Sequence, residues 1–247
     1  MKRIAMWSGP RNLSTAMMRS FGSRADTACI DEPFYAAYLD KTDTDHPLRA
    51  ETLARHERDA EKVAEDLVNG HRDAEIFYQK HMTQHMVEGI PREWMAHVTN
   101  VFLIRHPARV LASFAKKMSK VTLDDIGFVQ QTDLCNEVRD LTGKPPIVID
   151  TDDILADPKQ ALTALCEAID IPFDEAMLSW EAGPRPEDGA WAPYWYDSVW
   201  NSTGFAPPPG PLPEIKRELV PIMERAETHY ETLKAHAIKL TEEGPFS

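Results

Sequence analysis

The feature that most constrains the fold is a regular alternation of short apolar runs with stretches of helical periodicity. Buried strands are expected at residues 3–7, 27–31, 75–82, 99–104 and 146–150. Between them, apolar residues recur every three or four positions, as do Leu13, Met17 and Phe21. This spacing indicates parallel βαβ units with right-handed connections. We therefore predict the α/β class, as a three-layer α/β/α sandwich with a mainly parallel central sheet.

The 247 residues are enough for one large domain, and they contain no linker rich in Gly and Ser and no internal repeat. A single domain over 1–247 is therefore expected, with helices at 51–69 and 122–142. Residues 180–213 form a long loop rich in proline and aromatic residues, which is either a functional lid or a loop held down by its own rings. A C-terminal amphipathic helix at 213–240 either docks on its own domain or forms a dimer seam, so the chain is a monomer or a homodimer.

The turn between the first expected strand and the first expected helix contains Gly9, Pro10 and Arg11, followed by Asn12 and two hydroxyl residues. A helix N-terminus presents unpaired N–H groups and the positive end of the helix dipole. With an arginine and hydroxyl groups added, such a turn suits a phosphate or sulfate. The alternative is that Asn12 or Ser14 is an ordinary N-cap and Arg11 a surface charge.

The distribution of charge supports an anion site. The net charge of −13 argues against nucleic acid as a partner. Residues 1–25 and 105–120 nevertheless each contain five basic residues and no acidic one. Either the two segments hold a small anion between them, or both are solvated helix faces.

Two further pairs of polar residues stand where expected strands end. Asp31 and Glu32 follow the second strand, and Lys80 and His81 end the third. The carboxyl ends of parallel strands form the usual ligand crevice. The alternatives are that Asp31 or Glu32 caps the next helix and that His81 is structural.

No apolar run approaches the roughly 20 residues that cross a bilayer, and the N-terminus has no signal-peptide pattern. The three cysteines are too few and too scattered for a disulfide frame or a metal cluster, and Cys135 and Cys166 are expected to fill the core. We expect a cytoplasmic protein without a membrane partner or a metal.

Two of these segments resemble the donor-binding motifs of sulfotransferases. Residues 10–15, Pro-Arg-Asn-Leu-Ser-Thr, resemble the loop P-[KR]-S-G-[ST]-T. Arg105-His106-Pro107, with Ser113 eight residues after the arginine, resembles R-D-P-x5-S. The resemblance implies a P-loop NTPase-like sulfotransferase fold and the donor 3′-phosphoadenosine 5′-phosphosulfate. It places the 5′-phosphosulfate on Pro10, Arg11, Asn12, Leu13, Ser14 and Thr15, and the 3′-phosphate on Arg105 and Ser113.

The sequence departs from the family pattern in three places. Asn12-Leu13 replaces the usual Ser-Gly pair, and because Leu13 cannot sample the conformations open to glycine, a wider loop or a shifted donor is expected. His106 replaces the aspartate of the second motif. The family's C-terminal Gly-rich donor loop is not found in its usual form, and Ser202-Thr203-Gly204 is the candidate to replace it.

The resemblance implies a catalytic role for Arg11, which stabilises developing charge without a metal, and offers two candidates for the general base. His81 occupies the position used by cytosolic sulfotransferases. Glu32 occupies the position used by bacterial carbohydrate sulfotransferases, and Asp-Glu-Pro-Phe follows that pattern closely, which favours Glu32. The acceptor is expected to be a hydroxyl or amine of a small molecule or carbohydrate.

Two other functions fit the same fold. A P-loop kinase or NTPase would use Asp150 or Asp153 for a metal, but its loop has the form G-x-x-x-x-G-K-[ST], and this turn has one glycine and no lysine. A non-catalytic nucleotide-binding module would explain Leu13 and the missing Gly-rich loop.

Overall fold

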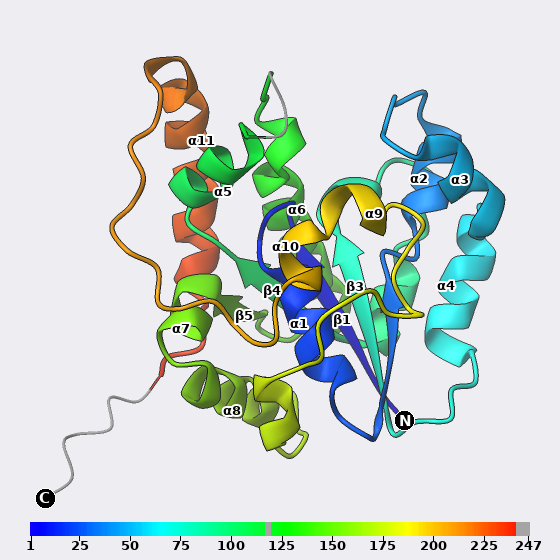
Figure 1. Cartoon of the computed structure of the whole chain (residues 1–247). Helices are drawn as coiled ribbons and strands as arrows, with labels where there is room; N and C mark the ends of the chain where they lie inside the picture. The colour runs from blue at the N-terminus through cyan, green and yellow to red at the C-terminus, as the bar shows by residue number, and fades with distance from the viewer. Residues whose placement is uncertain (117–119, 241–247) are drawn as a thin grey trace, which may run out of the picture.

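The computed structural model describes residues 1–116 and 120–240 (Figure 1). Its centre is a five-stranded sheet with the order β2-β3-β1-β4-β5, and every neighbouring pair of strands is parallel. The predicted parallel sheet is therefore confirmed. The strands are β1 (Lys2–Ser8), β2 (Thr27–Asp31), β3 (Ile76–Met82), β4 (Thr99–Ile104) and β5 (Ile147–Asp150).

Helices cover both faces of the sheet, which confirms the three predicted layers. Ile4 and Met6 of β1 pack toward α1, α7 and α8, whereas Ala5 and Trp7 pack toward α4, α5, α6 and α11. This is the alternation that a strand buried on both faces requires. The helices are α1 (Ser14–Gly22), α2 (Tyr35–Lys41), α3 (Arg49–Arg55), α4 (Ala60–Asn69), α5 (Pro107–Phe114), α6 (Phe128–Thr142), α7 (Thr151–Ala156), α8 (Pro158–Ala168), α9 (Ala192–Trp195), α10 (Asp197–Trp200) and α11 (Val220–Lys234).

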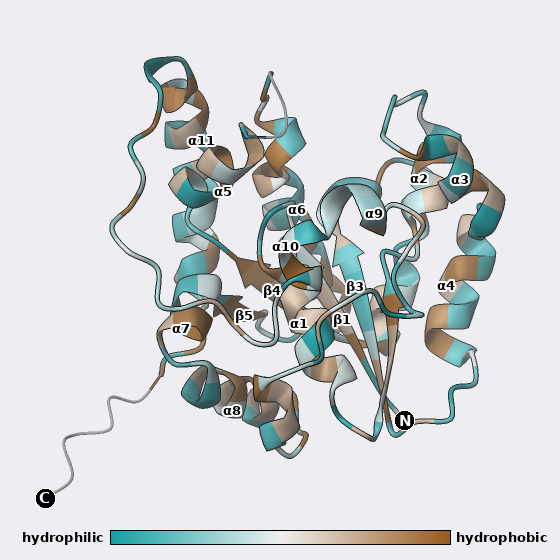
Figure 2. Cartoon of the chain, in the orientation of Figure 1, coloured by the Kyte–Doolittle hydropathy of each residue, from teal (hydrophilic) through white to brown (hydrophobic). Residues whose placement is uncertain are grey.

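The strands differ in polarity along the sheet. In Figure 2, β4 and β5 are brown, whereas β3 carries a teal stretch. Gln79, Lys80 and His81 of β3 are all buried, at 0 to 2 % exposed. Buried polar groups need partners, so β3 is the strand on which a polar site is to be sought.

Three predicted helix boundaries are wrong. The helix expected at 51–69 is two helices, because α3 ends at Arg55 and the Asp59 carboxylate caps α4 by accepting from the Glu61 and Lys62 N–H groups. The helix expected at 122–142 begins at Phe128, after Gly127 at φ 70°. The helix expected at 213–240 is α11, Val220–Lys234, and Pro221 lies in its first turn, where a proline disfavours helical conformation in the residue before it.

The segment 180–213 and α11 both pack on their own fold. Trp191 and Tyr196 are 1 % and 5 % exposed, so the loop is held down by its own rings as one prediction stated. The loop also contains α9 and α10. Ala226, Tyr230 and Leu233 of α11 are buried in the core with α5 and α6, which confirms docking on the same domain.

Cys135 and Cys166 lie in the two cores as predicted. In the described part of the chain, no helix is both long enough and apolar enough to cross a bilayer.

Candidate active site

A cavity of about 680 Å³ opens at the edge of the sheet where the strands end. The segments that follow β1, β2, β3 and β4 all line it, through residues 10–16, Glu32, residues 82–87 and Arg105 respectively. The predicted crevice is therefore present, and it brings together Pro10, Arg11, Asn12, Leu13, Ser14, Thr15, Glu32, Arg105 and Ser113.

The two sequence motifs meet in this cavity. The Arg11 Nε donates to the Ser113 hydroxyl at 2.9 Å, and the Arg105 Nη1 donates to the Arg11 carbonyl at 2.6 Å. Residues 94 and 102 positions apart are thus bonded directly. The turn after β1, Arg105 just before α5 and Ser113 in the last turn of α5 therefore form one surface.

This end of the cavity is built for an anion. Burial lowers the pKa of Arg11, and within the described residues no carboxylate pairs with its guanidinium group. The Arg105 Nε is buried without a hydrogen-bond partner. The first turn of α1 contains no acidic residue, so the positive end of its dipole is not neutralised. Among the described residues, neither guanidinium group has a carboxylate within 4 Å, and no acidic side chain lies in the first turn of α1.

The turn holds unusual backbone geometry. Leu13 is the N-cap residue of α1 at φ 66°, ψ 5°, and no side chain caps the helix. The predicted cap by Asn12 or Ser14 is therefore wrong, and so is the expectation that Leu13 avoids glycine-like conformations. Arg11 and Glu32 also have positive φ, at 62° and 42°. Left-handed geometry costs a non-glycine residue about 1–3 kcal/mol, and such strain is concentrated at functional sites.

Gly9 is required by packing. A Cβ atom there would lie 2.6 Å from the Ile126 carbonyl oxygen, which is closer than a non-bonded carbon and oxygen can pack. Gly9 therefore allows the turn after β1 to pack against the backbone of Ile126.

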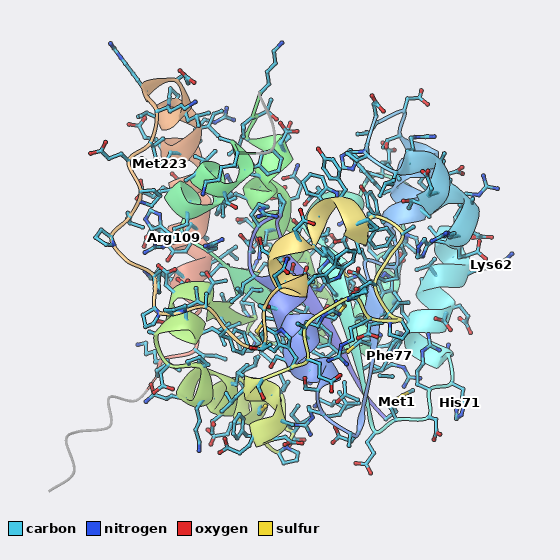
Figure 3. All side chains as sticks on the ribbon, viewed as in Figure 1. Met1, Lys62, His71, Phe77, Arg109 and Met223 are labelled. Atoms are coloured by element: carbon cyan, nitrogen blue, oxygen red, sulfur yellow. The ribbon has the colours of Figure 1, made fainter. Side chains whose placement is uncertain are left out.

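The second motif keeps its geometry with a different residue. His106 accepts the Ala108 N–H at 3.2 Å through Nδ1 and so caps α5, which an aspartate would also do. Arg109, four residues before Ser113, does not line the cavity: its Nε donates to Asp152 at 3.0 Å and its Nη2 to the Gly210 carbonyl at 2.7 Å. Figure 3 labels Arg109 beside the segment that leads to α11.

A buried ion-pair network lies beside the anion end. The Lys80 Nζ donates to Asp31 Oδ1 at 2.8 Å, to Tyr196 Oη at 2.9 Å and to Glu32 Oε1. The Tyr196 hydroxyl in turn donates to Asp31 Oδ2 at 2.7 Å. Burial opposes the charged form of Lys80, but the carboxylates of Asp31 and Glu32 raise its pKa well above its ordinary value. The network ties the ends of β2 and β3 to the aromatic loop.

Glu32, Lys80 and Tyr196 of this network all line the cavity, and Glu32 is the carboxyl group among them. Burial raises the pKa of Glu32 to about 7, against the opposing effect of the Lys80 ammonium. Because Oε1 is bonded to Lys80, the other oxygen is left toward the cavity side, where His85 Nε2 lies 3.9 Å from Oε2. The alternative that Asp31 or Glu32 caps the next helix is wrong, since Phe34 is the N-cap residue of α2 and no side chain bonds there.

His81 faces the opposite side of the sheet from Lys80. Its ring stacks on Trp7 at 4.5 Å between centroids, lies near Trp94 at 5.2 Å and is 2 % exposed. Burial lowers the pKa of His81 to about 3. Adjacent strand residues point to opposite faces, so Lys80 and His81 cannot both serve the cavity. His81 does not line the cavity, which supports the alternative that this histidine is structural.

Ser202, Thr203 and Gly204 do not line the cavity either. The Ser202 hydroxyl accepts from Trp180 Nε1 at 3.1 Å, the Thr203 carbonyl accepts the Trp180 N–H, and Gly204 forms a β-bridge with Ser179. Their polar groups secure the aromatic loop, so the interpretation of this segment as a donor loop is wrong for this cavity.

The structure adds site residues that the sequence analysis did not identify. Tyr35, Tyr38, His46 and His85 also line the cavity. Tyr35 and Tyr38 lie one turn apart on α2, which helical periodicity could have indicated. His85 and His46 lie in a 3₁₀ turn and a loop, so no periodic pattern marked them. Within the described residues, no cluster of three His, Cys, Asp or Glu residues is arranged to hold a metal ion.

Comparison with known proteins agrees with this geometry. Residues 1–237 match the family described as sulfotransferase domain. The chain belongs to the sulfotransferase family. The sulfotransferase is similar in fold to the sulfotransferase domain of the Synechococcus PCC 7002 olefin synthase, with a TM-score of 0.52 and 16 % identity over 92 % of this chain and 94 % of that one. It is also similar to a sulfotransferase from Alicyclobacillus acidocaldarius, with a TM-score of 0.54 and 11 % identity over 94 % of this chain and 95 % of that one.

One protein that is similar to this chain in sequence comes from a plant. The chain is 39 % identical over 236 residues to branched-chain-amino-acid aminotransferase-like protein 1 of Arabidopsis thaliana. The match covers 94 % of this chain and 42 % of that protein. Because the chain spans less than half of that relative, the relative's name describes the longer protein and is not transferred to this chain.

Proposed function

We propose that this sulfotransferase moves a sulfuryl group from 3′-phosphoadenosine 5′-phosphosulfate to a hydroxyl group, with Glu32 as the general base. One observation carries the proposal: a carboxyl group with a pKa near 7 and two arginines that have no carboxylate within 4 Å among the described residues line the same cavity. The residues fit the donor, because the anion end offers the guanidinium fork and helix N-terminus that suit phosphate and sulfate oxygens.

The donor, when bound, supplies the electrophilic sulfuryl group and a phosphate leaving group. Arg11 and the N-terminus of α1 hold negative charge where the leaving oxygen develops it. Arg105 and Ser113 hold the second phosphate. Glu32 takes the proton from the acceptor hydroxyl as that oxygen bonds to sulfur and the bond from sulfur to the phosphate oxygen breaks. Lys80 fixes one oxygen of Glu32 and leaves the other for this proton.

Binding of the product nucleotide tests the donor class. At about 100 times its Kd, 3′,5′-adenosine bisphosphate is expected to raise the melting temperature by roughly 5–10 °C, with or without magnesium. Arg105→Ala abolishes this shift, and Arg139→Ala, a change at an exposed arginine of α6, leaves it unchanged. The measurement is differential scanning fluorimetry. Stabilisation by ATP and magnesium alone would show the nucleotide site to be that of a kinase or NTPase.

The pH dependence of turnover tests the base. Glu32 must be ionised to accept a proton, so kcat/KM is expected to be constant above pH 8 and to fall about tenfold per pH unit below pH 6, with a midpoint near 7. In Glu32→Gln, this fall of kcat/KM at acidic pH is expected to be absent. A base at His81, whose pKa is about 3, gives no such fall near neutrality. Nucleotide binding without any sulfated product from a broad panel of acceptors would instead favour a non-catalytic module.

A further inference from the structure

The cavity has two chemically different ends. Arg11 and Arg105 define the donor end. Another part of the lining consists of aromatic rings and of three carboxylates from two segments, and we call it the acceptor end. Its residues are Tyr35, Tyr38, His46, His85, Asp45, Asp124 and Asp125.

Direct contacts join these residues into one surface. The His85 ring stacks on Tyr35 at 4.4 Å and on Tyr38 at 4.9 Å between centroids. The Tyr35 hydroxyl is hydrogen-bonded to His46 Nδ1 at 2.5 Å. Burial lowers the pKa of His46, and the carboxylates of Asp125 and Asp45 oppose this shift, so both lie close to its ring. The aromatic wall and the acidic rim are therefore adjacent.

The acceptor end also contains a buried polar atom without a partner. His85 is 3 % exposed, yet its Nδ1 has no hydrogen bond. Burial lowers the pKa of His85 well below its ordinary value, so the ring is neutral and one of its nitrogens is a hydrogen-bond acceptor. The buried carbonyl oxygens of the Gln84 and Gln130 side chains, which also line the cavity, lack partners too. Such atoms call for a ligand that donates hydrogen bonds.

The charge at this end is uncompensated. Among the described residues that line it, Lys80 is the basic one at neutral pH, and its ammonium group is fully used by Asp31, Glu32 and Tyr196. The carboxylates of Asp45, Asp124 and Asp125 have no basic partner within 4 Å among the described residues. Carboxylates and aromatic rings together are the surroundings that bind ammonium groups in proteins.

We propose that the acceptor is a small alcohol that carries a positive charge, as a protonated amine or a quaternary ammonium group. This inference rests on the proposed function, because it assigns the hydroxyl to Glu32 and the cationic group to the aromatic wall and acidic rim. The residues assigned to the cationic group differ from Arg11, Arg105 and Ser113, so different side chains hold the acceptor and the donor. A neutral or anionic alcohol of the same size leaves the carboxylates of the acidic rim without a cationic partner, and a protonated amine in addition donates hydrogen bonds to the buried acceptor atoms.

The test compares two alcohols of nearly the same shape. Choline has a positively charged nitrogen at the position where 3,3-dimethylbutan-1-ol has a neutral carbon. Glycolate serves as an anionic alcohol. Each is titrated by calorimetry into the protein with and without 3′,5′-adenosine bisphosphate. Choline is expected to bind at least about tenfold more tightly than its neutral counterpart, and glycolate more weakly than either. In the complete reaction, the same order is expected for kcat/KM.

A matched pair of variants locates the effect. Asp45→Asn is expected to weaken choline binding about two- to fivefold and to leave the neutral alcohol unchanged, because an exposed carboxylate is screened by solvent. Asp43→Asn changes an exposed carboxylate of the same loop that does not line the cavity, and it leaves both affinities unchanged. Equal affinities for the two alcohols, or no binding of choline, overturn the inference. Binding of 3′,5′-adenosine bisphosphate in the absence of an alcohol tests the proposed function. If the bisphosphate does not bind, the proposed function fails, independently of the acceptor.

Discussion

Glu32→Gln is expected to lower kcat by about 10²–10⁴-fold, the range that a general base contributes. Glutamine keeps the size of the side chain and an oxygen for the Lys80 ammonium, but it cannot accept the proton of the acceptor hydroxyl. The nucleotide contacts come from Arg11, Arg105 and Ser113, so stabilisation by 3′,5′-adenosine bisphosphate is retained. Turnover of a donor and acceptor pair, followed by release of the bisphosphate, gives the measurement.

His81→Phe is the matched control for this prediction. Phenylalanine suits the aromatic cluster of Trp7, Phe34 and Trp94 in which His81 is buried. This variant is expected to keep kcat within a few-fold of the native value. If His81→Phe loses activity while Glu32→Gln retains it, the assignment of the base is wrong.

Lys80→Met is expected to lower the free energy of unfolding by about 3–5 kcal/mol, as removal of one partner from a buried ion pair does. Methionine fills a similar volume but leaves Asp31 and Glu32 buried without a counter-charge, and their side chains are 1 % and 10 % exposed. The Tyr196 hydroxyl also loses a donor. Urea denaturation of the folded protein gives the difference in free energy.

The control for this second prediction is Lys62→Met, at an exposed lysine of α4 that Figure 3 labels. Its effect is expected to stay within about 0.5 kcal/mol. Combining Lys80→Met with Glu32→Gln is expected to cost less than the sum of the two single changes, because the neutral amide no longer needs the ammonium. A loss below about 1 kcal/mol in Lys80→Met would mean that water or a local shift compensates the two carboxylates.

Several elements were predictable because their signals are local. Apolar runs between amphipathic stretches placed all five strands within about two residues, and the spacing of Pro10–Thr15 and Arg105–Ser113 indicated a shared anion site. Helix boundaries at 51–69 and 213–240 were less predictable. The Asp59 cap sets the start of α4, and a proline lies at the start of α11. Both features limit a helix at places where the hydrophobic pattern of the sequence continues.

The sequence did not predict which side chains contact one another in the folded protein. Lys80 and His81 are neighbours in the chain, and both looked equally well placed at the end of a strand. Pleating sends Lys80 to the two carboxylates and His81 into an aromatic core, and only the packed sheet shows which face holds the cavity. Tyr196 reaches Asp31 across 165 residues, a contact with no local signal.

Sequence by itself determined the order of strands and helices, the parallel architecture and the turn that we propose binds an anion, because periodicity and turn chemistry are local properties. Tertiary structure decided which of the two candidate bases lines the cavity, the geometry of Leu13 and the side chains of the proposed acceptor end. Those depend on burial and on contacts between distant segments: Leu13 is held at φ 66° by its surroundings, and the pKa of Glu32 is raised by burial that no stretch of sequence contains.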